Sequence, residues 1–344
     1  MTIYFINMNE SWVEKYRPKQ LDKVESQDEI ITSLKNCITT KNIPHMLFAG
    51  PSGCGKTSAI LALAREIFGA KYWDDRVFEF NASDERGIKV VRDKIKKYAM
   101  NSINDDHNIP PFKLIILDEA DNMTSDSQCA LRKIMEDCTN TRFCIICNYH
   151  YKIIDPIISR CSVYRFKPVP KDKIYKKLKD ICVMEECIIA DEIIGQIETI
   201  SRGDLRKAIN FLQRCQNIKK FINNSQHIDA INTNIIEIAS GIMPQKILIQ
   251  FIEDCIAGKM EKINTMINMF YTESYSLTIQ IPNIINYIIK KPKMPDSVKS
   301  HICELLLSID NYLLNGCDEI IQYNRLAYGI YFQINKHKIE NTKK

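Results

Sequence analysis

Five short apolar runs between residues 43 and 166 alternate with stretches of helical periodicity. The runs cover residues 46–49, 77–80, 114–117, 143–147 and 162–166, and a helix is predicted from 57 to 68, where Gly69 ends it. Strands that alternate with helices form a mostly parallel sheet with both faces covered. We therefore predict an α/β domain whose ligands bind beyond the carboxyl ends of the strands.

Two prolines, Pro168 and Pro170, end this alternation. The residues after them have only helical patterns, which a polar stretch at 217–234 interrupts. A chain of 344 residues is expected to hold more than one domain. We predict an α/β domain over residues 1–166, a small helical domain over 167–235 and an all-helical domain over 236–344. In the last of these, one face of a predicted helix carries Val298, Ile302, Leu305, Ile309 and Leu313.

The composition is typical of a soluble globular protein, with 45% apolar and 26% charged residues. The 13 cysteines are an odd number spread along the chain, which favours reduced thiols inside the cell over a disulfide framework. Cys144 and Cys147 have a C-x-x-C spacing, but they lie in an apolar run and favour a buried strand over a metal or redox site. Residues 1–10 lack the features of a secretory peptide, and no apolar run is long enough for a bilayer. We expect an intracellular protein without a membrane partner.

A phosphate-binding motif lies between the first predicted strand and the helix that follows. Residues 50–57 read Gly-Pro-Ser-Gly-Cys-Gly-Lys-Thr and fit G-x-x-x-x-G-K-[ST]. Glycines let backbone N–H groups face a phosphate, the helix N-terminus adds partial positive charge, Lys56 can reach the β- and γ-phosphates, and the Thr57 hydroxyl can bind Mg²⁺. We predict an ATP site formed by Gly50, Pro51, Ser52, Gly53, Cys54, Gly55, Lys56, Thr57 and Ser58. The alternative is a glycine-rich turn without a ligand.

An acidic pair ends the third predicted strand. Asp118 and Glu119 follow four apolar residues, which places them at the same edge of the sheet as the phosphate loop. We predict that Asp118 holds Mg²⁺ and that Glu119 orients the attacking water, with Lys56 as the second catalytic residue. An exposed acidic turn is the alternative. Asn148, at the end of the fourth strand, is a candidate γ-phosphate sensor or a simple turn residue.

Six segments carry a family resemblance: Trp-Val-Glu-Lys-Tyr-Arg-Pro at 12–18, Asn-Ala-Ser-Asp-Glu-Arg-Gly at 81–87, Asp-Glu-Ala-Asp at 118–121, residues 141–149, Ser-Arg-Cys at 159–161 and Gly-Asp-Leu-Arg-Lys-Ala at 203–208. In this order they resemble the small subunits of replication factor C, which are AAA+ ATPases of sliding-clamp loaders. The resemblance covers about residues 10–215, and the helical remainder is compatible with the family's collar domain. Two segments depart from the family: the loop reads Pro-Ser-Gly-Cys-Gly in place of the common Pro-Pro-Gly-Thr-Gly, and residues 23–28 differ.

The resemblance implies an AAA+ nucleotide-binding domain, a helical lid and a collar. It also assigns roles to residues outside the phosphate loop. Asn148 and Arg206 would sense the γ-phosphate, and Arg160 would be an arginine finger that acts in trans on a neighbouring subunit. Without the resemblance, Arg160 reads as a surface ion pair and Arg206 as a solvated helix residue. Four residues would border the adenine, namely Val13, Tyr16, Arg17 and Pro18.

The resemblance further implies partners: other subunits in a hetero-pentamer, a sliding clamp, and primer–template DNA held through its phosphate backbone. Candidate DNA contacts are Arg86, Lys89 and Arg92, near a predicted helix whose apolar stripe includes Ile95; a solvated amphipathic helix is the alternative. The expected function is ATP-driven clamp loading at sites of DNA replication, in a nucleus or a viral replication compartment, with ATP and Mg²⁺ as cofactors. Alternatives are another AAA+ DNA-processing ATPase of the branch-migration or origin-recognition type, a weakly hydrolysing subunit that donates an arginine finger, or, more remotely, a small-molecule kinase.

Overall fold

A computed structural model of the chain describes residues 11–82, 88–100, 110–187, 189–223, 236, 239–292 and 294–342. The chain divides into two units, residues 1–231 and 232–344. The finer division into three domains, with a boundary at residue 166, stays a prediction.

The first unit contains a five-stranded parallel sheet in the order β2-β3-β4-β1-β5. Its strands are β1 (Met46–Ala49), β2 (Val77–Asn81), β3 (Lys113–Asp118), β4 (Thr141–Cys147) and β5 (Ser162–Arg165). All five apolar runs are therefore strands, as predicted. Because the strands are parallel and β1, β3 and β4 lie side by side or one strand apart, their carboxyl ends meet at one edge of the sheet.

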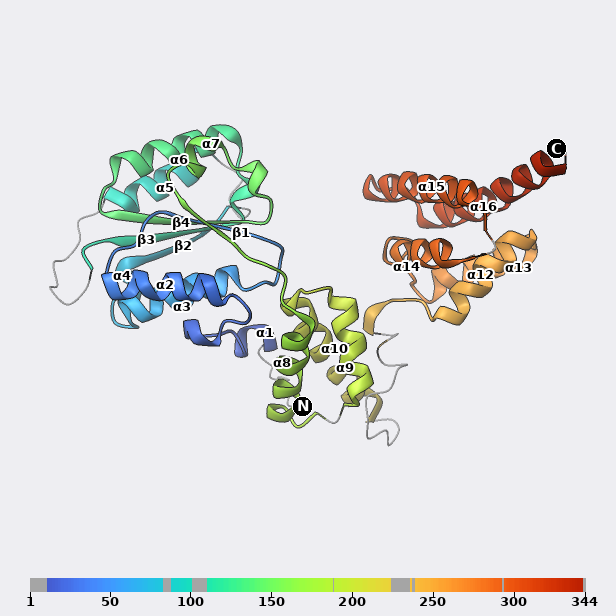
Figure 1. Cartoon of the computed structure of the whole chain (residues 1–344), viewed down its shortest axis with the longest axis horizontal. Coiled ribbons are helices and arrows are strands. Elements are labelled where there is room, and N and C mark those ends of the chain that lie inside the picture. The colour runs from blue at the N-terminus through green and yellow to red at the C-terminus, as the bar shows by residue number, and fades with distance from the viewer. Residues whose placement is uncertain are drawn as a thin grey trace, which may run out of the picture. The chain divides into compact units, whose positions relative to one another are not determined.

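Helices cover both faces of the sheet (Figure 1). One face carries α2 (Asp28–Thr40) and α3 (Lys56–Phe68), with α4 (Trp73–Arg76) beside α3, and the other carries α5 (Ile88–Met100), α6 (Ser125–Asp137) and α7 (Asp155–Ile158). Alternate residues of β3 belong to different cores: Leu114 and Ile116 pack with α3, whereas Ile115 and Leu117 pack with α6. Burial on both faces explains why the strands read as continuous apolar runs.

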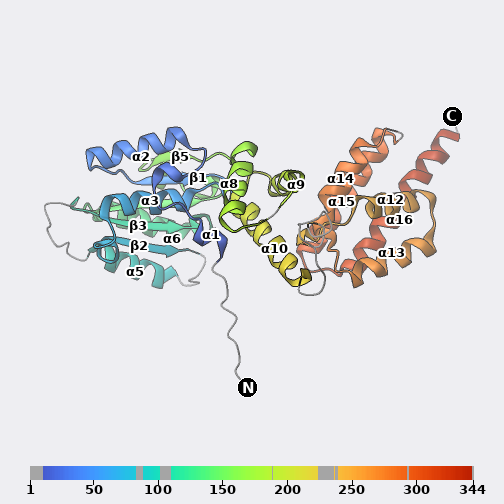
Figure 2. The same ribbon diagram turned by 90° about the horizontal axis from the view of Figure 1, so that it is seen from below.

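The first unit also contains the helices α8 (Lys171–Met184), α9 (Asp191–Ser201) and α10 (Leu205–Asn223). The short helix α1 (Trp12–Lys15) packs against α10, and both views show it beside the α8–α10 group (Figures 1 and 2). The N-terminal segment thus reaches the helices that follow the sheet domain.

The second unit is helical, with α12 (Gln245–Ala257), α13 (Met260–Thr272), α14 (Leu277–Lys290), α15 (Asp296–Leu314) and α16 (Glu319–Thr342) around one apolar core. The predicted helix is α15, and Val298, Ile302 and Ile309 are buried in that core, as predicted. Leu306 is fully buried, while Leu305 and Leu313 are partly buried at its edge. The sequence pattern placed Leu305, three residues after Ile302, on the buried face. In the structure Leu306, four residues after Ile302, lies deeper in the core, because a step of four residues stays closer to the buried face of this helix.

Cys144 and Cys147 are buried in β4 with free thiols, which confirms the strand interpretation. Within the ranges given above, no helix has the length and apolar character needed to cross a membrane.

Candidate nucleotide site

The phosphate loop joins β1 to α3 and contains two glycines in left-handed conformations. Gly53 has φ +65° and Gly55 has φ +96°, a region that residues with a Cβ rarely adopt. A Cβ on Gly53 would lie 1.8 Å from Oδ1 of Asp204, so the loop also leaves no room for a side chain there. The predicted glycine loop is therefore present, and it opens a helix whose N-terminal amides suit a phosphate.

Lys56 lies inside this loop with only 7% of its surface exposed. Its Nζ donates hydrogen bonds to the carbonyl oxygens of Gly50 and Pro51, both at 2.8 Å, and to Oδ1 of Asn148 at 3.0 Å. The structure thus brings the predicted γ-phosphate sensor next to the phosphate-loop lysine. Gly50 and Pro51 contact Lys56 through their carbonyl groups and are not among the residues that line the pocket.

The side chains of Thr57 and Asp118 lie close enough together to bind one Mg²⁺ ion. The Thr57 hydroxyl donates to Oδ2 of Asp118 at 2.8 Å, and Oδ1 of Asp118 accepts the backbone N–H of Glu119 at 2.9 Å. Hydroxyl and carboxylate oxygens are hard ligands of the kind that Mg²⁺ prefers together with substrate phosphates. The residues present therefore fit Mg²⁺ bound with a nucleotide.

Glu119 has a left-handed backbone, with φ +54°. Such a conformation is uncommon for a residue with a side chain and is often found at functional sites. Asn122 fixes the turn twice, because its backbone N–H donates to the Glu119 carbonyl at 2.9 Å and its Nδ2 donates to Oε2 of Glu119 at 3.2 Å. These bonds fix the position of Glu119, which lines the pocket.

The helices after the sheet close the site from the other side. Ser52 donates to Oδ2 of Asp204 at 2.7 Å, and the backbone N–H of Leu205 donates to the Gly53 carbonyl at 3.2 Å. Asp204 caps α10 by accepting the backbone N–H of Lys207 at 2.9 Å. Arg206, the predicted second sensor, lies two residues after Asp204 in the first turn of α10 and lines the pocket.

The same pocket is also lined by the predicted adenine-bordering residues and by further residues that were not predicted for it. Val13, Tyr16, Arg17 and Pro18 all line this pocket, and their contact with adenine stays a prediction. The additional lining residues are Lys23, Val24, Glu25, Val169, Lys177, Leu205 and Ile209. Leu205 lies in the segment 203–208 that carries the family resemblance, and Lys23, Val24 and Glu25 lie in the segment 23–28 that departs from the family pattern. Val169, Lys177 and Ile209 belong to no motif in the sequence.

Two of these additional lining residues form an ion pair. The Lys177 ammonium, from α8, lies 3.8 Å from Oε1 of Glu25, and both side chains are mostly shielded from solvent. The lining of the pocket therefore includes a paired carboxylate and ammonium besides its apolar side chains.

The remaining loop residues also have clear places. Ser52, Cys54 and Ser58 line the pocket. The Cys54 thiol is buried and donates to the Pro51 carbonyl at 2.9 Å, and burial raises the pKa of Cys54. A low fraction of thiolate makes this cysteine a poor nucleophile in spite of its place beside the phosphate loop.

Arg160 is not among the residues that line this pocket. It follows α7 and is 39% exposed, and its guanidinium pairs with Glu136 and donates to the Pro156 carbonyl at 2.8 Å. The geometry brings Arg160 to the surface of the unit and not to the chain's own phosphate site.

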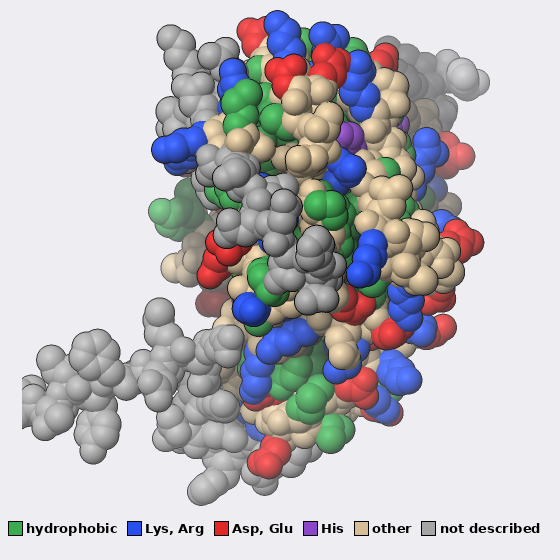
Figure 3. Space-filling model, turned by 90° about the vertical axis from the view of Figure 1, so that its left-hand side faces the viewer, with side chains coloured by type: hydrophobic (Ala, Val, Ile, Leu, Met, Phe, Trp, Pro, Cys, Tyr) green, Lys and Arg blue, Asp and Glu red, His purple; other side chains and the backbone are tan. Residues whose placement is uncertain are grey.

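The candidate DNA contacts fall largely outside the described part of the chain. Arg86 and the side chains of Lys89 and Arg92 lie outside the described residues. Further along α5, Ile95 of the predicted apolar stripe is buried, whereas the next residue, Lys96, is exposed. On the face in Figure 3, basic and acidic side chains are interspersed, which fits the modest net charge of +5.

Comparisons with known proteins agree with the architecture. Residues 46–169 match the model for the ATPase family associated with various cellular activities (AAA), and residues 243–328 match the replication factor C C-terminal domain. The chain is 40% identical to replication factor C subunit 2 of Saccharomyces cerevisiae, over 93% of this chain and 92% of that protein. It is 41% identical to replication factor C subunit 4 of Homo sapiens, over 95% and 89% of the two chains, and 42% identical to the replication factor C small subunit of Archaeoglobus fulgidus, over 93% and 97%.

A solved structure of the RuvB Holliday junction branch migration motor of Thermotoga maritima is also similar. Its TM-score is 0.52 at 17% identity, over 70% of this chain and 79% of that one. At this level of identity the similarity concerns the fold alone. The predicted α/β fold followed by helical domains, of AAA+ type, is therefore confirmed.

Proposed function

Because the chain belongs to the replication factor C family as a small subunit with an AAA ATPase domain, we propose that it works as one ATPase subunit of a sliding-clamp loader. In this proposal, ATP binding assembles a ring of subunits that opens a clamp around primer–template DNA, and hydrolysis releases the clamp. The observation that carries the proposal is the pocket in which Lys56, Thr57, Asp118 and Glu119 meet.

The phosphate half of the pocket would bind and orient the triphosphate. Lys56 would exchange its carbonyl partners for phosphate oxygens, while the loop amides hold the β-phosphate. Thr57 and Asp118 would hold Mg²⁺, which supplies neutralising charge to the β- and γ-phosphates when it is bound. Glu119 would orient and polarise the attacking water, because phosphoryl transfer depends on positioning and charge stabilisation above all.

Two residues would report the γ-phosphate to the rest of the protein. Asn148 already contacts the Lys56 ammonium at 3.0 Å, which supports its role as the first sensor. Arg206 follows the α10 cap that touches the phosphate loop, which supports its role as the second. A γ-phosphate bound by both would tie the sheet domain to the helices after it.

Arg160 would act in trans as an arginine finger. Its place outside its own pocket and its partial exposure support this role, because the side chain would have to reach a neighbouring subunit. A guanidinium that stabilises the charge of the transferring phosphoryl group is worth about 10³-fold or more in rate. The ion pair with Glu136 would keep the side chain extended until a neighbour docks.

Contacts with other subunits would use the second unit. The last helix, α16, carries a row of side chains that are each at least half exposed: Ile321, Tyr328, Phe332 and Ile339. A row of exposed apolar residues on one helix suits packing against partner subunits. Phosphate-backbone contacts with DNA, through Arg86, Lys89 and Arg92, complete the proposal and would be salt-dependent and independent of base sequence.

Two alternatives have less support. A branch-migration motor has a similar fold, but the second unit matches the replication factor C C-terminal domain. A weakly hydrolysing structural subunit would not need Lys56, Thr57, Asp118 and Glu119 to be assembled in one pocket, as they are.

The test is ATP hydrolysis by the chain alone and by the chain with partner subunits, each with and without a sliding clamp and primed DNA. We expect weak activity alone and strong stimulation in the complete assembly. Glu119→Gln should keep ATP binding and abolish turnover, while the exposed control Asp126→Asn should leave both unchanged. Turnover that clamp and primed DNA do not stimulate, in an assembly of all partner subunits, would count against clamp loading.

A further inference from the structure

The part of the pocket proposed to bind the adenine base, called the base half below, is lined by a segment too short to be a stable helix by itself. Val13, Tyr16, Arg17 and Pro18 belong to α1 or follow it directly, and α1 has only four residues. A single isolated turn is unstable in water because helix nucleation is costly. Contacts with the rest of the unit must therefore fix this wall of the pocket.

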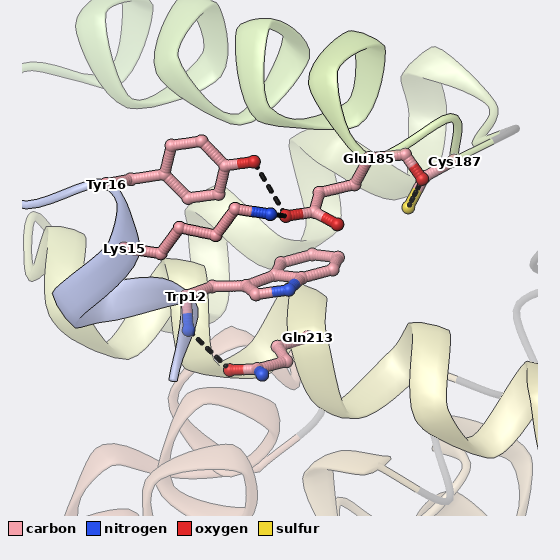
Figure 4. Close-up of polar contacts among 6 residues, drawn as sticks. All are labelled: Trp12, Lys15, Tyr16, Glu185, Cys187 and Gln213. Carbon is pink, nitrogen blue, oxygen red and sulfur yellow. Dashed lines mark hydrogen bonds and ion pairs between the residues drawn. The ribbon is translucent and has the colours of Figure 1, made fainter. Parts of the chain in front are cut away.

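The first contact joins the segment to the C-terminal end of α8 through Glu185. The Tyr16 hydroxyl and the Lys15 ammonium both donate to Oε1 of Glu185, each at 2.6 Å (Figure 4). Only 18% of the Glu185 side chain is exposed. Burial, and then the bond to Glu185, raise the pKa of Tyr16, so its phenol stays a donor at neutral pH.

The second contact joins the segment to α10. The backbone N–H of Trp12 donates to Oε1 of Gln213 at 3.0 Å, and the Trp12 indole is almost fully buried. Figure 4 shows the two contacts close together, with Trp12 on the same side of α1 as Lys15. Of Glu185 and Gln213, only Glu185 accepts a hydrogen bond from the side chain of a pocket residue, Tyr16, in these two contacts.

The helices that receive these contacts also line the pocket. Lys177 of α8 and Ile209 of α10 are lining residues, and they lie about two turns before Glu185 and one turn before Gln213, respectively. A displacement of the N-terminal segment from α8 would therefore open the base half of the pocket. The phosphate half, built from the loop and the strand ends, would keep its own contacts.

We propose that Glu185 is a positioning residue of the nucleotide site, which holds Tyr16 and the N-terminal segment against the helices that follow the sheet domain. This inference rests on the proposed function, in which the pocket binds ATP with its base in this half. It predicts that the loss of Glu185 weakens binding of the adenosine part of ATP and spares binding of the phosphates.

The experiment compares two ligands of the full-length chain by calorimetry: ATP with Mg²⁺, and inorganic tripolyphosphate with Mg²⁺. Glu185→Ala should weaken ATP binding about 5- to 10-fold, as expected for the loss of charge-assisted hydrogen bonds. Tripolyphosphate affinity should stay at the wild-type value, and so should kcat at saturating ATP, while KM rises. Glu185→Gln keeps an oxygen acceptor for Tyr16 and should have a smaller effect, about 2- to 3-fold.

Two controls separate positioning from simple loss of structure. The neighbouring Glu186 is exposed, so Glu186→Gln should change neither affinity. The double exchange Lys15→Glu with Glu185→Lys restores an ion pair and should recover part of the ATP affinity that Glu185→Lys alone loses.

The outcomes distinguish this inference from the proposed function. If the wild-type chain bound neither ligand, the proposed function itself would be wrong. If the wild-type chain bound ATP and Glu185→Ala bound it equally well, the ATP site would stand and the positioning role would be refuted. An equal loss of ATP and tripolyphosphate affinity in Glu185→Ala would also refute it, because the effect would not be confined to the base half.

Discussion

Gly53→Ala should destabilise the first unit, because the new side chain would collide with Asp204, which is distant in the sequence. Gly53 has φ +65°, where an alanine costs about 1–2 kcal/mol. The added Cβ would lie 1.8 Å from Oδ1 of Asp204, so the Asp204 side chain must move. It would then lose its capping bond to the Lys207 N–H, worth about 1 kcal/mol, and its bond from Ser52, also about 1 kcal/mol. The expected loss of unfolding free energy is therefore about 3–4 kcal/mol.

A double-mutant cycle tests this reasoning. Asp204→Ala alone should cost about 2 kcal/mol, because it removes the same two bonds. Combined with Gly53→Ala, it should add almost nothing, so the double variant should fall short of additivity by about 2 kcal/mol. Both tryptophans, Trp12 and Trp73, lie in the first unit, so their fluorescence in urea follows the unfolding of that unit. Additive effects of the two substitutions would refute the proposed steric coupling between the loop and the α10 cap.

Three further predictions concern other parts of the first unit. Thr57→Val removes the hydroxyl that contacts Asp118 at 2.8 Å and should reduce Mg²⁺-dependent ATPase activity at least about tenfold, which a Mg²⁺ titration of the ATPase rate would measure; an unchanged titration would contradict the metal assignment. Arg160→Ala should leave the affinity of the isolated chain for ATP unchanged but lower ATPase activity of the assembly by about 10³-fold, whereas an unaffected assembly would exclude action in trans. Burial lowers the pKa of His45, whose Nδ1 accepts the Phe143 N–H at 3.2 Å, so its contribution to stability is complete above about pH 6.5 and falls as the pH drops below that value. The urea midpoint should therefore fall from pH 7.5 to 5.5 less steeply in His45→Gln than in the wild type, and equal slopes would rule out His45 as the cause.

The sheet and the phosphate half of the site could be predicted because each depends on a local pattern. An apolar run followed by the glycine motif specifies β1, the loop and the start of α3 within a few residues. Asp118 was predicted to meet Thr57 because parallel strands deliver their carboxyl ends to one edge, and the 2.8 Å bond between the two side chains agrees with that.

The base half of the site could be predicted only in part. The family resemblance pointed to Val13 and Tyr16, and the departure of residues 23–28 from the family pattern marked the segment of Glu25, but nothing pointed to Lys177 or Glu185. On an amphipathic helix, a charged residue that faces a pocket has the same local pattern as one that faces water. Whether it faces a pocket depends on how the helices pack in the tertiary structure, which the local sequence pattern does not contain.

The contact between Gly53 and Asp204 illustrates the same limit. Each residue belonged to a predicted motif, yet the two motifs were considered separately. Their packing explains why a side chain at Gly53 would be excluded for steric as well as conformational reasons.

The order of the strands has a consequence for protein synthesis. In the sheet, Met46 of β1 pairs with Cys144 on one side and with Ser162 on the other, so both edges of β1 stay unpaired until these later strands have left the ribosome. Chains emerge at about 5–20 residues per second and fold from the N-terminus where they can, and unpaired strand edges invite aggregation in the meantime. A nascent chain of this protein therefore stays without a complete ATP-binding pocket until α10 has been made, and the edges of β1 are unpaired over most of that interval.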